Sequence, residues 1–438
     1  MGRSFCFNSL TANYLILDRN TYKWLIYKTK NLNKANNKKL TIKEKNILKS
    51  LIKNDLLISK KGEDVKKISR QRKYHKSVLR KKKKLIFLGF CMTDNCNFRC
   101  SYCIKKKCNS SNKKKTYLRF KTAKKRIDQF IELAIKNKIK KVTIAFGGGE
   151  PLLNFSVLKK IVNYAKEKSK EKVFIDFEIT TNSALLNEKI IKFLALNKFD
   201  VGVSLDGLRK SNLGRKYKDG TETFKDVLRS LKLIMKEINS KKITIGSVIH
   251  NQNVGLIRNN FLDFIKNLGI KKVCIEPDMV GFIKCNYDKL LKNVINLYSY
   301  GSRIGLEVTG YWQKPFKNLI FKKNIASCPS FAGTAITIDV MGQIRPCIYL
   351  NEYKTSKEIK DIFSGNYIDF IEKNWTCNIS QCKNCELEGA CMGGCYLTRK
   401  IGDSKIFKLR CRLFKDMTKF LIKEMLKENY SQIKKELK

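Results

Sequence analysis

Six short runs of β-branched and aromatic residues alternate with amphipathic helices between residues 86 and about 310, and this alternation restricts the fold more than any other feature. The runs are KLIFLGF, KKVTIAF, KVFIDFEITTN, FDVGVSLDG, KKITIGSVI and KKVCIEPD. Stretches between them, such as FKTAKKRIDQFIELAIKN and TFKDVLRSLKLIMKEIN, carry apolar residues at helical spacing. Alternation of this kind is typical of parallel β-α-β units. Six units predict an α/β fold with a partial (β/α)6 barrel.

Three cysteines directly follow the first predicted strand, where parallel α/β barrels place their chemistry. The segment CMTDNCNFRCSYC contains Cys96, Cys100 and Cys103, separated by three and two residues. Three thiolates on a tight loop can hold three irons of a cubic [4Fe–4S] cluster and leave the fourth iron open. A zinc site would need four ligands, and neither Cys91 nor Cys108 has a familiar Cys-x2-Cys offset.

A glycine-rich segment, FGGGEPLLN, ends the second predicted strand. Gly147, Gly148 and Gly149 allow the backbone to approach a small molecule closely, and Glu150 adds a carboxylate at the strand tip. A triple glycine alone fits an ordinary turn equally well. The glycine segment therefore indicates a ligand site only in combination with the cysteine triad.

The chain has 16 cysteines but only two histidines, His75 and His250. It opens without a secretory signal, and its apolar stretches are too short to cross a bilayer, so we expect a soluble, cytoplasmic protein. In a reducing compartment, many cysteines indicate metal binding rather than disulfides. Thiolates rather than imidazoles are then the expected ligands.

The net charge is +54, from 92 Lys and Arg against 38 Asp and Glu. A lysine-rich coding bias explains most of this excess. The functional interpretation is an acidic partner, either nucleic acid or peptide. An acidic peptide is preferred over nucleic acid, because no RNA-binding motif or platform of aromatic and basic residues accompanies the charge.

The cysteine triad, with Tyr102 before its last cysteine, and the later segments GGEP, TTNSALL and VSLDG together resemble the radical S-adenosylmethionine (SAM) enzymes. The resemblance covers residues 86 to about 280. It implies that the open iron binds the amino and carboxylate groups of SAM. Reduction then cleaves SAM to methionine and a 5′-deoxyadenosyl radical, which removes a hydrogen atom from the substrate.

The same resemblance implies roles for residues at the ends of the second, third and fourth predicted strands. It implies that Gly148, Gly149 and Glu150 contact the methionine amino group. It implies polar contacts to SAM from Asn182 and Ser204, with Asp206 supporting the loop. Many family members have a histidine after SLDG, where this chain has Ser211 and Asn212.

A second set of cysteines is spaced like the SPASM extension of radical SAM enzymes, as C-x13-G-x4-C, then C-x2-C-x5-C-x3-C, then a final cysteine. That resemblance implies two auxiliary iron–sulfur clusters. The ligands that it implies for the distal cluster are Cys382, Cys385, Cys391 and Cys411. Those that it implies for the cluster nearer SAM are Cys328, Cys347 and Cys395. The alternative is a zinc ribbon, because the C-x2-C and C-x3-C pairs can wrap one zinc ion.

Some SPASM members supply a fourth ligand to the nearer cluster from a position that is Lys322 here, which cannot bind iron. Either one iron stays open to substrate, or another cysteine replaces the missing ligand. The candidates for this place are Cys274, Cys285 and Cys377. The remaining cysteines are expected to act as small apolar residues: Cys6, Cys91 and Cys108.

Residues 1–85 contain two β-like runs, NYLILD and KWLIYK, then a helical stretch that begins after Thr41 as N-cap, and a charged connector, SRQRKYHKSVLRKKKK. The unit resembles the small winged-helix domain fused to many maturases of ribosomally made peptides. That resemblance implies capture of a leader segment, often acidic, as an added β-strand. A plain structural extension is the alternative.

We therefore predict a radical SAM peptide maturase of four parts. These are a winged-helix-like domain (1–85), a partial barrel (86–310), a SPASM domain (311–415) and a C-terminal helix (416–438). The expected reaction is thioether crosslinking of a precursor peptide that carries a leader segment. A flavodoxin- or ferredoxin-type protein is the expected electron donor.

Two other classes of function stay open. The first is a SPASM enzyme of other chemistry: peptide epimerisation, carbon–carbon crosslinking, sulfatase-type maturation or cofactor biosynthesis. Sulfatase-type maturation is disfavoured, because Ile348 stands where such enzymes carry an Asp that acts as a base. The second is a non-enzymatic metal-binding adaptor, which would have no use for the open triad and GGGEP.

Overall fold

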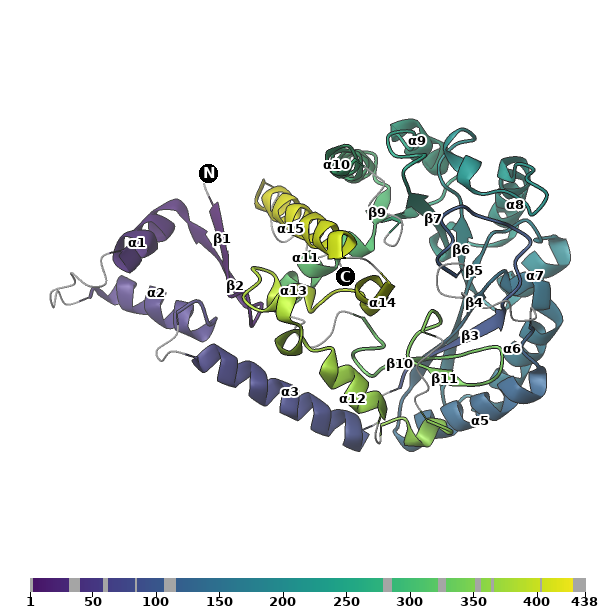
Figure 1. Cartoon of the computed structure of the whole chain (residues 1–438), viewed down its shortest axis with the longest axis horizontal. Helices are drawn as coiled ribbons and strands as arrows, with labels where there is room; N and C mark the ends of the chain where they lie inside the picture. Colours follow the sequence, from purple (N-terminus) through teal and green to yellow (C-terminus); the bar gives the residue numbers. More distant parts are fainter. Residues whose placement is uncertain are drawn as a thin grey trace.

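The computed structural model describes residues 3–30, 40–57, 62–82, 85–105, 116–278, 286–321, 328–350, 356–363, 366–401 and 404–427. Figure 1 shows a barrel of strands and helices, an N-terminal unit at the opposite side of the molecule, and a C-terminal region between them. In the described part of the chain, no helix is both long and apolar enough to cross a membrane.

A parallel sheet forms the barrel, and all six predicted strands are present in it. They are β3 (Phe87–Thr93), β4 (Lys141–Gly148), β5 (Phe174–Thr181), β6 (Asp200–Ser204), β7 (Ile243–Ile249) and β8 (Lys272–Pro277). Each pairs in parallel with the next in chain order. The predicted α/β fold class is therefore confirmed.

Three further strands extend this sheet at its two edges. Strand β9 (Glu307–Thr309) pairs with β8, and β10 (Ala335–Ile338) pairs in parallel with β3 and antiparallel with β11 (Ile344–Arg345). The sequence analysis did not predict them, because two to four residues are too few to show a periodic pattern. Through β10 and β11 the C-terminal region continues the sheet of the barrel.

Helices cover the outer face of the sheet (Figure 1). They are α5 (Phe120–Lys136), α6 (Phe155–Ser169), α7 (Glu188–Leu196), α8 (Phe224–Glu237), α9 (Asn259–Asn267) and α10 (Tyr287–Arg303). Side chains of the strands that point outward are fully buried against them, among them Ile144, Phe177 and Ile245. This apolar layer is the main core, and removing its area from water stabilises the fold.

The opposite face of the strands points into the barrel and is polar or small. The pairing register aligns Glu178 with Asp200, Gly202 with Thr244, and Gly246 with Cys274. Neighbouring residues of a strand point to opposite faces, so these side chains lie on the face away from the apolar core. Glycines in this layer leave space inside the barrel near the carboxyl ends of the strands.

The N-terminal unit is a hairpin followed by three helices. Its elements are β1 (Arg3–Phe7), β2 (Tyr14–Asp18), α1 (Arg19–Lys30), α2 (Ile42–Lys53) and α3 (Glu63–Lys82). The N-cap prediction is confirmed, because Thr41 and Glu44 form a reciprocal capping box at the start of α2.

Two local predictions for this unit were wrong. KWLIYK lies in α1 rather than in a strand. The reason is that Asp18 accepts hydrogen bonds from the backbone of Asn20 and Thr21, which caps this helix. The connector SRQRKYHKSVLRKK belongs to α3, where Arg72 donates to Thr376 and Lys76 pairs with Glu372. These contacts stabilise a helix whose composition alone indicated a linker.

The C-terminal region consists of short helices and one long helix. They are α11 (Lys314–Ile320), α12 (Asn366–Lys373), α13 (Glu388–Cys391), α14 (Tyr396–Ile401) and α15 (Ser404–Lys427). The helix predicted from residue 416 is the second half of α15. The N-terminal unit packs on this region, since Gly389 N–H donates to Ser9 O at 2.6 Å.

Candidate active site

The loop after β3 carries the cysteine triad in a partly buried position. Burial raises the pKa of the Cys96 thiol, and it raises that of Cys100 to about 11. The negative charge of Cys103 contributes to both shifts, so the three sulfurs lie close together. Buried thiols of this kind become thiolates only beside a strong positive charge, which bound iron supplies.

The three thiols of the triad match the donor set of an iron–sulfur cluster. In such a cube each thiolate binds a different iron. The donor set is therefore compatible with [4Fe–4S].

A buried network holds the triad loop against the barrel. Tyr102 Oη donates to Asp206 Oδ2, and Arg215 Nη1 donates to Tyr102 Oη at 2.8 Å. The other carboxylate oxygen of Asp206 accepts from Val248 N at 2.9 Å. The charge of Arg215 also lowers the pKa of Cys100 against the effect of burial. The sequence analysis missed Arg215, which stands in the stretch SNLGRKYKDG without a motif.

The glycine segment packs directly on the start of the triad loop. Gly148 has a φ of +119°, and a Cβ on Gly149 would lie 1.9 Å from Asn95 O. The backbone N–H groups of Gly149 and Glu150 donate to Thr93 O and Asn95 O at 2.8 and 2.9 Å. Only glycine permits this close approach. Gly148 and Gly149 therefore let the triad loop pack against the end of β4, in addition to any contact that they make with a ligand.

Glu150 joins the ends of β4 and β5. Its buried carboxylate accepts from Thr181 Oγ1 at 2.7 Å, Asn182 N at 2.8 Å and Leu152 N at 3.1 Å. Asn182 Nδ2 in turn donates to Asn97 Oδ1 at 2.7 Å and lies 3.8 Å from Cys96 Sγ. The structure therefore brings Glu150 and Asn182 into one connected set with the triad.

Ser204 and Asp206 differ in their surroundings although they are two residues apart. Ser204, the last residue of β6, is partly exposed, and its hydroxyl makes no hydrogen bond to the residues that the structure describes. Asp206 is fully buried and engaged by Tyr102. Ser204 is thus available to a ligand, whereas Asp206 acts on the loop. Asn212, in the stretch where the resemblance implied a histidine, accepts from Asp206 N.

A carboxylate that the sequence analysis missed lies at the carboxyl end of β8. Glu276 Oε1 accepts from Tyr311 N at 2.6 Å and lies 3.6 Å from Cys274 Sγ. Burial raises the pKa of Glu276 to about 7, so this group can exchange a proton near neutral pH. The only available signal was an acidic residue within the apolar run KKVCIEPD.

Tyr311 connects this carboxylate to the C-terminal cysteines. Its backbone contacts Glu276, while its pKa is raised by burial and then by the charges of Cys395, Cys328 and Cys391. Its buried hydroxyl has no hydrogen-bond partner among the described residues. One residue therefore spans the distance between the barrel interior and the second cysteine set.

The C-terminal cysteines lie close enough to influence one another's ionisation, and their division into two ligand groups stays a prediction. Burial raises the pKa of Cys391 to about 12, and the charges of Cys411, Cys382 and Cys385 contribute. Burial also raises the pKa of Cys328, with a contribution from Cys395. Cys347 belongs with Cys328, because both charges raise the pKa of the buried Tyr367.

Arg410 fixes the loop that presents Cys391 and Cys395. This buried side chain donates to Cys395 O at 3.0 Å and Gly393 O at 3.2 Å. A Cβ on Gly394 would lie 3.0 Å from its guanidinium carbon. The charge of Arg410 also lowers the pKa of Cys391 and Cys411 against burial, so it favours thiolates there.

The other cysteines occupy varied positions. Cys274 faces the barrel interior, and Cys377 is exposed in a short 3-10 turn. Cys6 is partly buried in β1, and Cys91 is buried with its sulfur 3.4 Å from Lys105 Nζ. Three residues named above lie outside the described residues: Cys108, Cys285 and Lys322. The fourth ligand of the nearer group stays a prediction.

Comparison with known proteins gives one family and several relatives. The family model of the Radical SAM superfamily matches residues 90–257. The chain is 31% identical over 350 residues to "Radical SAM cyclopropyl synthase TigE" from Paramaledivibacter caminithermalis, covering 76% of this chain and 72% of that protein. It is 24% identical over 324 residues to a "Cysteine-type anaerobic sulfatase-maturating enzyme" from Clostridium novyi, covering 69% and 85%.

Two solved structures share the fold. "Native anSMEcpe with bound AdoMet" superposes with a TM-score of 0.64 at 21% identity, covering 78% of this chain and 98% of that chain. "Streptococcus suis SuiB bound to precursor peptide SuiA" gives a TM-score of 0.55 at 18% identity and covers 92% and 97%. The second similarity includes most of the chain.

Proposed function

The chain belongs to the radical SAM superfamily, and on that premise we propose that it forms a thioether link within a ribosomally made precursor peptide. It is a radical SAM enzyme of the peptide- or protein-maturase type, and it uses a [4Fe–4S] cluster and SAM. The proposal is carried by the position of Tyr311. Its backbone N–H donates to Glu276 in the barrel, and its side chain lies near Cys328 and Cys395.

In this proposal the triad holds the SAM-binding cluster, and the two C-terminal groups hold auxiliary clusters. When bound and reduced, the first cluster supplies the electron that cleaves SAM and so provides the 5′-deoxyadenosyl radical. Gly148, Gly149 and Glu150 form the wall that faces the methionine part of SAM. Asn182 and Ser204 offer polar contacts at the ends of β5 and β6, and Asp206 holds the loop in place through Tyr102.

The proposed reaction removes two hydrogens from the peptide for each bond. One leaves a carbon as a hydrogen atom and ends in 5′-deoxyadenosine. The other leaves the cysteine sulfur as a proton. The one electron left over when the carbon–sulfur bond forms would pass to the auxiliary cluster that Cys328, Cys347 and Cys395 would hold, and it balances the electron consumed in SAM cleavage. Glu276 is the group that accepts this proton, because its carboxylate lies at the carboxyl end of β8 and has a pKa raised to about 7 by burial.

The N-terminal hairpin is the proposed leader site. It has only two strands, so each has one edge without a neighbouring strand within the sheet. An extended leader can add to such an edge through backbone hydrogen bonds. The fold similarity to SuiB in complex with a precursor peptide covers most of this chain and supports this assignment.

Carbon–carbon bond formation is the second candidate, favoured by the 31% identity to a cyclopropyl synthase. It also removes two hydrogens, so the product mass alone cannot separate it from a thioether. Sulfatase-type oxidation of a cysteine is the third. The Ile348 side chain lies next to Gly147 at the end of β4. Isoleucine cannot accept a proton, so sulfatase-type oxidation would need Glu276 as its base.

The test uses anaerobically reconstituted protein, SAM, dithionite and a cysteine-containing precursor peptide, to be sought among short reading frames near the gene. A thioether product has lost two hydrogens and one thiol, so it takes up one fewer iodoacetamide group than the substrate. A product that lost two hydrogens but kept all its thiols would establish the carbon–carbon alternative. The control is the peptide with its cysteines changed to serine, which should stay unmodified.

A further inference from the structure

The hydroxyl of Tyr311 is buried beside the C-terminal cysteines and has no hydrogen-bond partner among the described residues. The Tyr311 ring contacts that of Phe414 on α15, with ring centroids 5.7 Å apart. Arg410, whose guanidinium carbon lies 5.8 Å from the centre of the same Phe414 ring, donates to Cys395 O at 3.0 Å. These packing contacts place Tyr311 at the wall of the cysteine group.

A second buried donor without a partner lies at the same loop. Arg399 Nη1 makes no hydrogen bond to the part of the chain that the structure describes. A Cβ on Gly393, which stands between Cys391 and Cys395, would lie 2.6 Å from this nitrogen. Buried donors without an acceptor are costly and therefore rare in folded proteins. The thiolates and sulfides of an iron–sulfur cluster accept hydrogen bonds, so a cluster here would satisfy both donors.

A second tyrosine near these cysteines is arranged differently. Tyr367 is fully buried, and its hydroxyl donates to Ser330 O at 2.6 Å and to Ala335 O at 3.0 Å. Burial raises the pKa of both tyrosines, and the charge of Cys328 contributes to each shift. The proton of Tyr367 is therefore shared with backbone carbonyls, whereas that of Tyr311 is available to a bound group.

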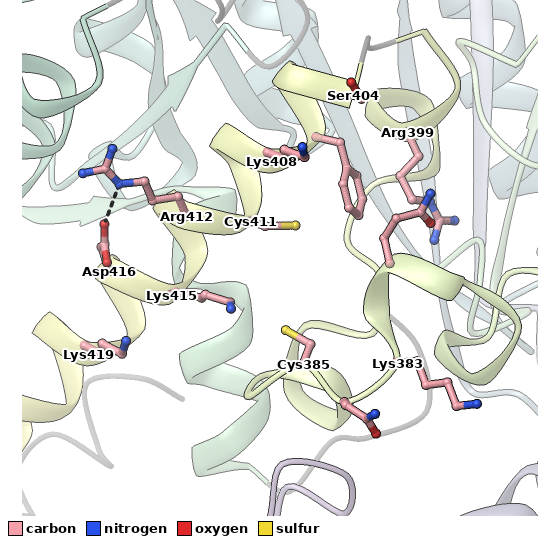
Figure 2. A pocket seen from close by; sticks show the side chains of 13 residues that line it. Lys383, Cys385, Arg399, Ser404, Lys408, Cys411, Arg412, Lys415, Asp416 and Lys419 are labelled. Atoms are coloured by element: carbon pink, nitrogen blue, oxygen red, sulfur yellow. Dashed lines mark ion pairs between the residues drawn. The ribbon is translucent and has the colours of Figure 1, made fainter.

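The distal cysteines have other neighbours. Cys385 and Cys411 border a pocket of about 810 Å³, and Figure 2 shows them on opposite sides of it. Six basic side chains belong to its lining: Lys383, Arg399, Lys408, Arg412, Lys415 and Lys419. Tyr311 is not among the described residues that line this pocket, and the cysteine charges that act most strongly on its hydroxyl are those of Cys395 and Cys328. Its hydroxyl is therefore directed to the group nearer SAM.

We propose that the Tyr311 phenol donates a hydrogen bond to a sulfur of the auxiliary cluster that Cys328, Cys347 and Cys395 would hold. A hydrogen bond to a sulfur stabilises the reduced state, which is the more negative one, and so raises the reduction potential. Burial and then the thiolate charges hold the pKa of Tyr311 well above its usual value, so the phenol keeps the proton that it donates. The inference rests on the proposed function, in which this cluster takes up the electron left over from the peptide.

Tyr311 thereby contacts both acceptors of the proposed reaction. Its backbone N–H donates to Glu276 Oε1 at 2.6 Å, and Glu276 takes the proton from the cysteine sulfur. Its hydroxyl acts on the acceptor of the electron. Tyr311 itself gains and loses neither proton nor electron, so its effect is on the potential and not on the bonds that form.

The test measures the potentials of the clusters in full-length, reconstituted protein without peptide, by redox titration followed with electron paramagnetic resonance. Added SAM identifies the signal of the triad cluster, and Cys411→Ala identifies that of the distal cluster by its loss. Tyr311→Phe should move the potential of the remaining cluster to more negative values. The expected change is about tenfold in the equilibrium constant of reduction, which corresponds to about 59 mV for one electron.

A second measurement detects the hydrogen bond in the native protein. Electron–nuclear double resonance in H2O and D2O should show an exchangeable proton coupled to the same cluster, and Tyr311→Phe should lack it. The matched control is Tyr367→Phe, which removes a hydroxyl near the same thiols. It should keep both the potential and the exchangeable proton, and it should unfold at a lower temperature, because its hydroxyl bonds to the backbone.

An unchanged potential in Tyr311→Phe would overturn the proposal, and so would equal shifts in the two tyrosine variants. A shift confined to the distal signal would contradict the assignment to the nearer cluster. Loss of that cluster from Tyr311→Phe would make the phenol oxygen an iron ligand instead of a donor. Absence of the exchangeable proton in native protein would overturn the proposal even if the variant failed to fold. No measurement uses peptide or turnover, so a failed crosslinking assay leaves these results independent.

Discussion

The two cysteine regions of this protein are built in opposite ways. The triad comes from one short loop, and Tyr102, Asp206 and Arg215 hold that loop from the side. The distal group takes its cysteines from separate short turns and from the long helix α15. A local motif can therefore define the first site, whereas the second exists only when the C-terminal region has folded.

The difference extends to what surrounds each site. The triad lies at the carboxyl ends of barrel strands, beside glycines and the buried carboxylate of Glu150. The distal group lies beside a pocket lined by six basic side chains. The first region lies at the carboxyl ends of the barrel strands, and the second at a positively charged pocket. Four predictions test this division, in order of decreasing effect.

Replacing Cys96, Cys100 and Cys103 together with alanine should abolish reductive cleavage of SAM. The auxiliary iron should remain, because the C-terminal thiols share no ligand with the loop. The measurements are 5′-deoxyadenosine by chromatography and iron per chain. Full SAM cleavage by this variant would remove the assignment of the triad, and loss of all iron would show that the two regions do not fold independently.

Arg410→Met should cost about 2–3 kcal/mol of stability, because it leaves buried carbonyl groups without a donor. It should also deplete auxiliary iron, while SAM cleavage per folded chain is kept. Thermal unfolding and iron analysis measure the two effects. Lys408→Met on the same helix is the control, since that side chain is exposed. An Arg410 variant with full iron would mean that this charge is dispensable at the distal group.

Glu276→Gln should slow peptide modification by about a hundredfold while SAM is still cleaved. In the native protein the rate of modification should rise as the pH increases through about 7, because only the carboxylate can take a proton. The variant should lose this dependence. It should also be more stable than the native protein at pH 8, since the buried negative charge is gone. A native rate that stays flat across neutral pH would exclude Glu276 as the acceptor.

Removing the leader from the precursor peptide should lower its processing at limiting concentration by about tenfold or more, through a higher KM. The full-length chain is kept, because the N-terminal unit bonds to the C-terminal region through Ser9 and Arg72. Peptide-independent SAM cleavage serves as the control. Equal KM values with and without the leader would reduce the hairpin to a structural extension.

The six barrel strands were predictable because each carries a run of β-branched and aromatic residues longer than a turn. The spacing of the C-terminal cysteines supplied the resemblance to the SPASM extension, and that resemblance implies their grouping, which stays a prediction. The sequence did not predict α3 as a helix, since its mean composition is that of a charged linker. Its stability comes from Arg72 and Lys76, whose partners Thr376 and Glu372 are about three hundred residues away.

Composition, strand periodicity and cysteine spacing are local properties, and they sufficed for the fold class and the family. The roles of Arg215, Glu276 and Tyr311 depended on tertiary structure. A single arginine or glutamate carries no pattern, and its pKa and partners arise only when distant segments bury it together. The same holds for the basic residues that line the pocket beside Cys385 and Cys411. Lysines occur throughout this chain, and only folding brings these particular ones together.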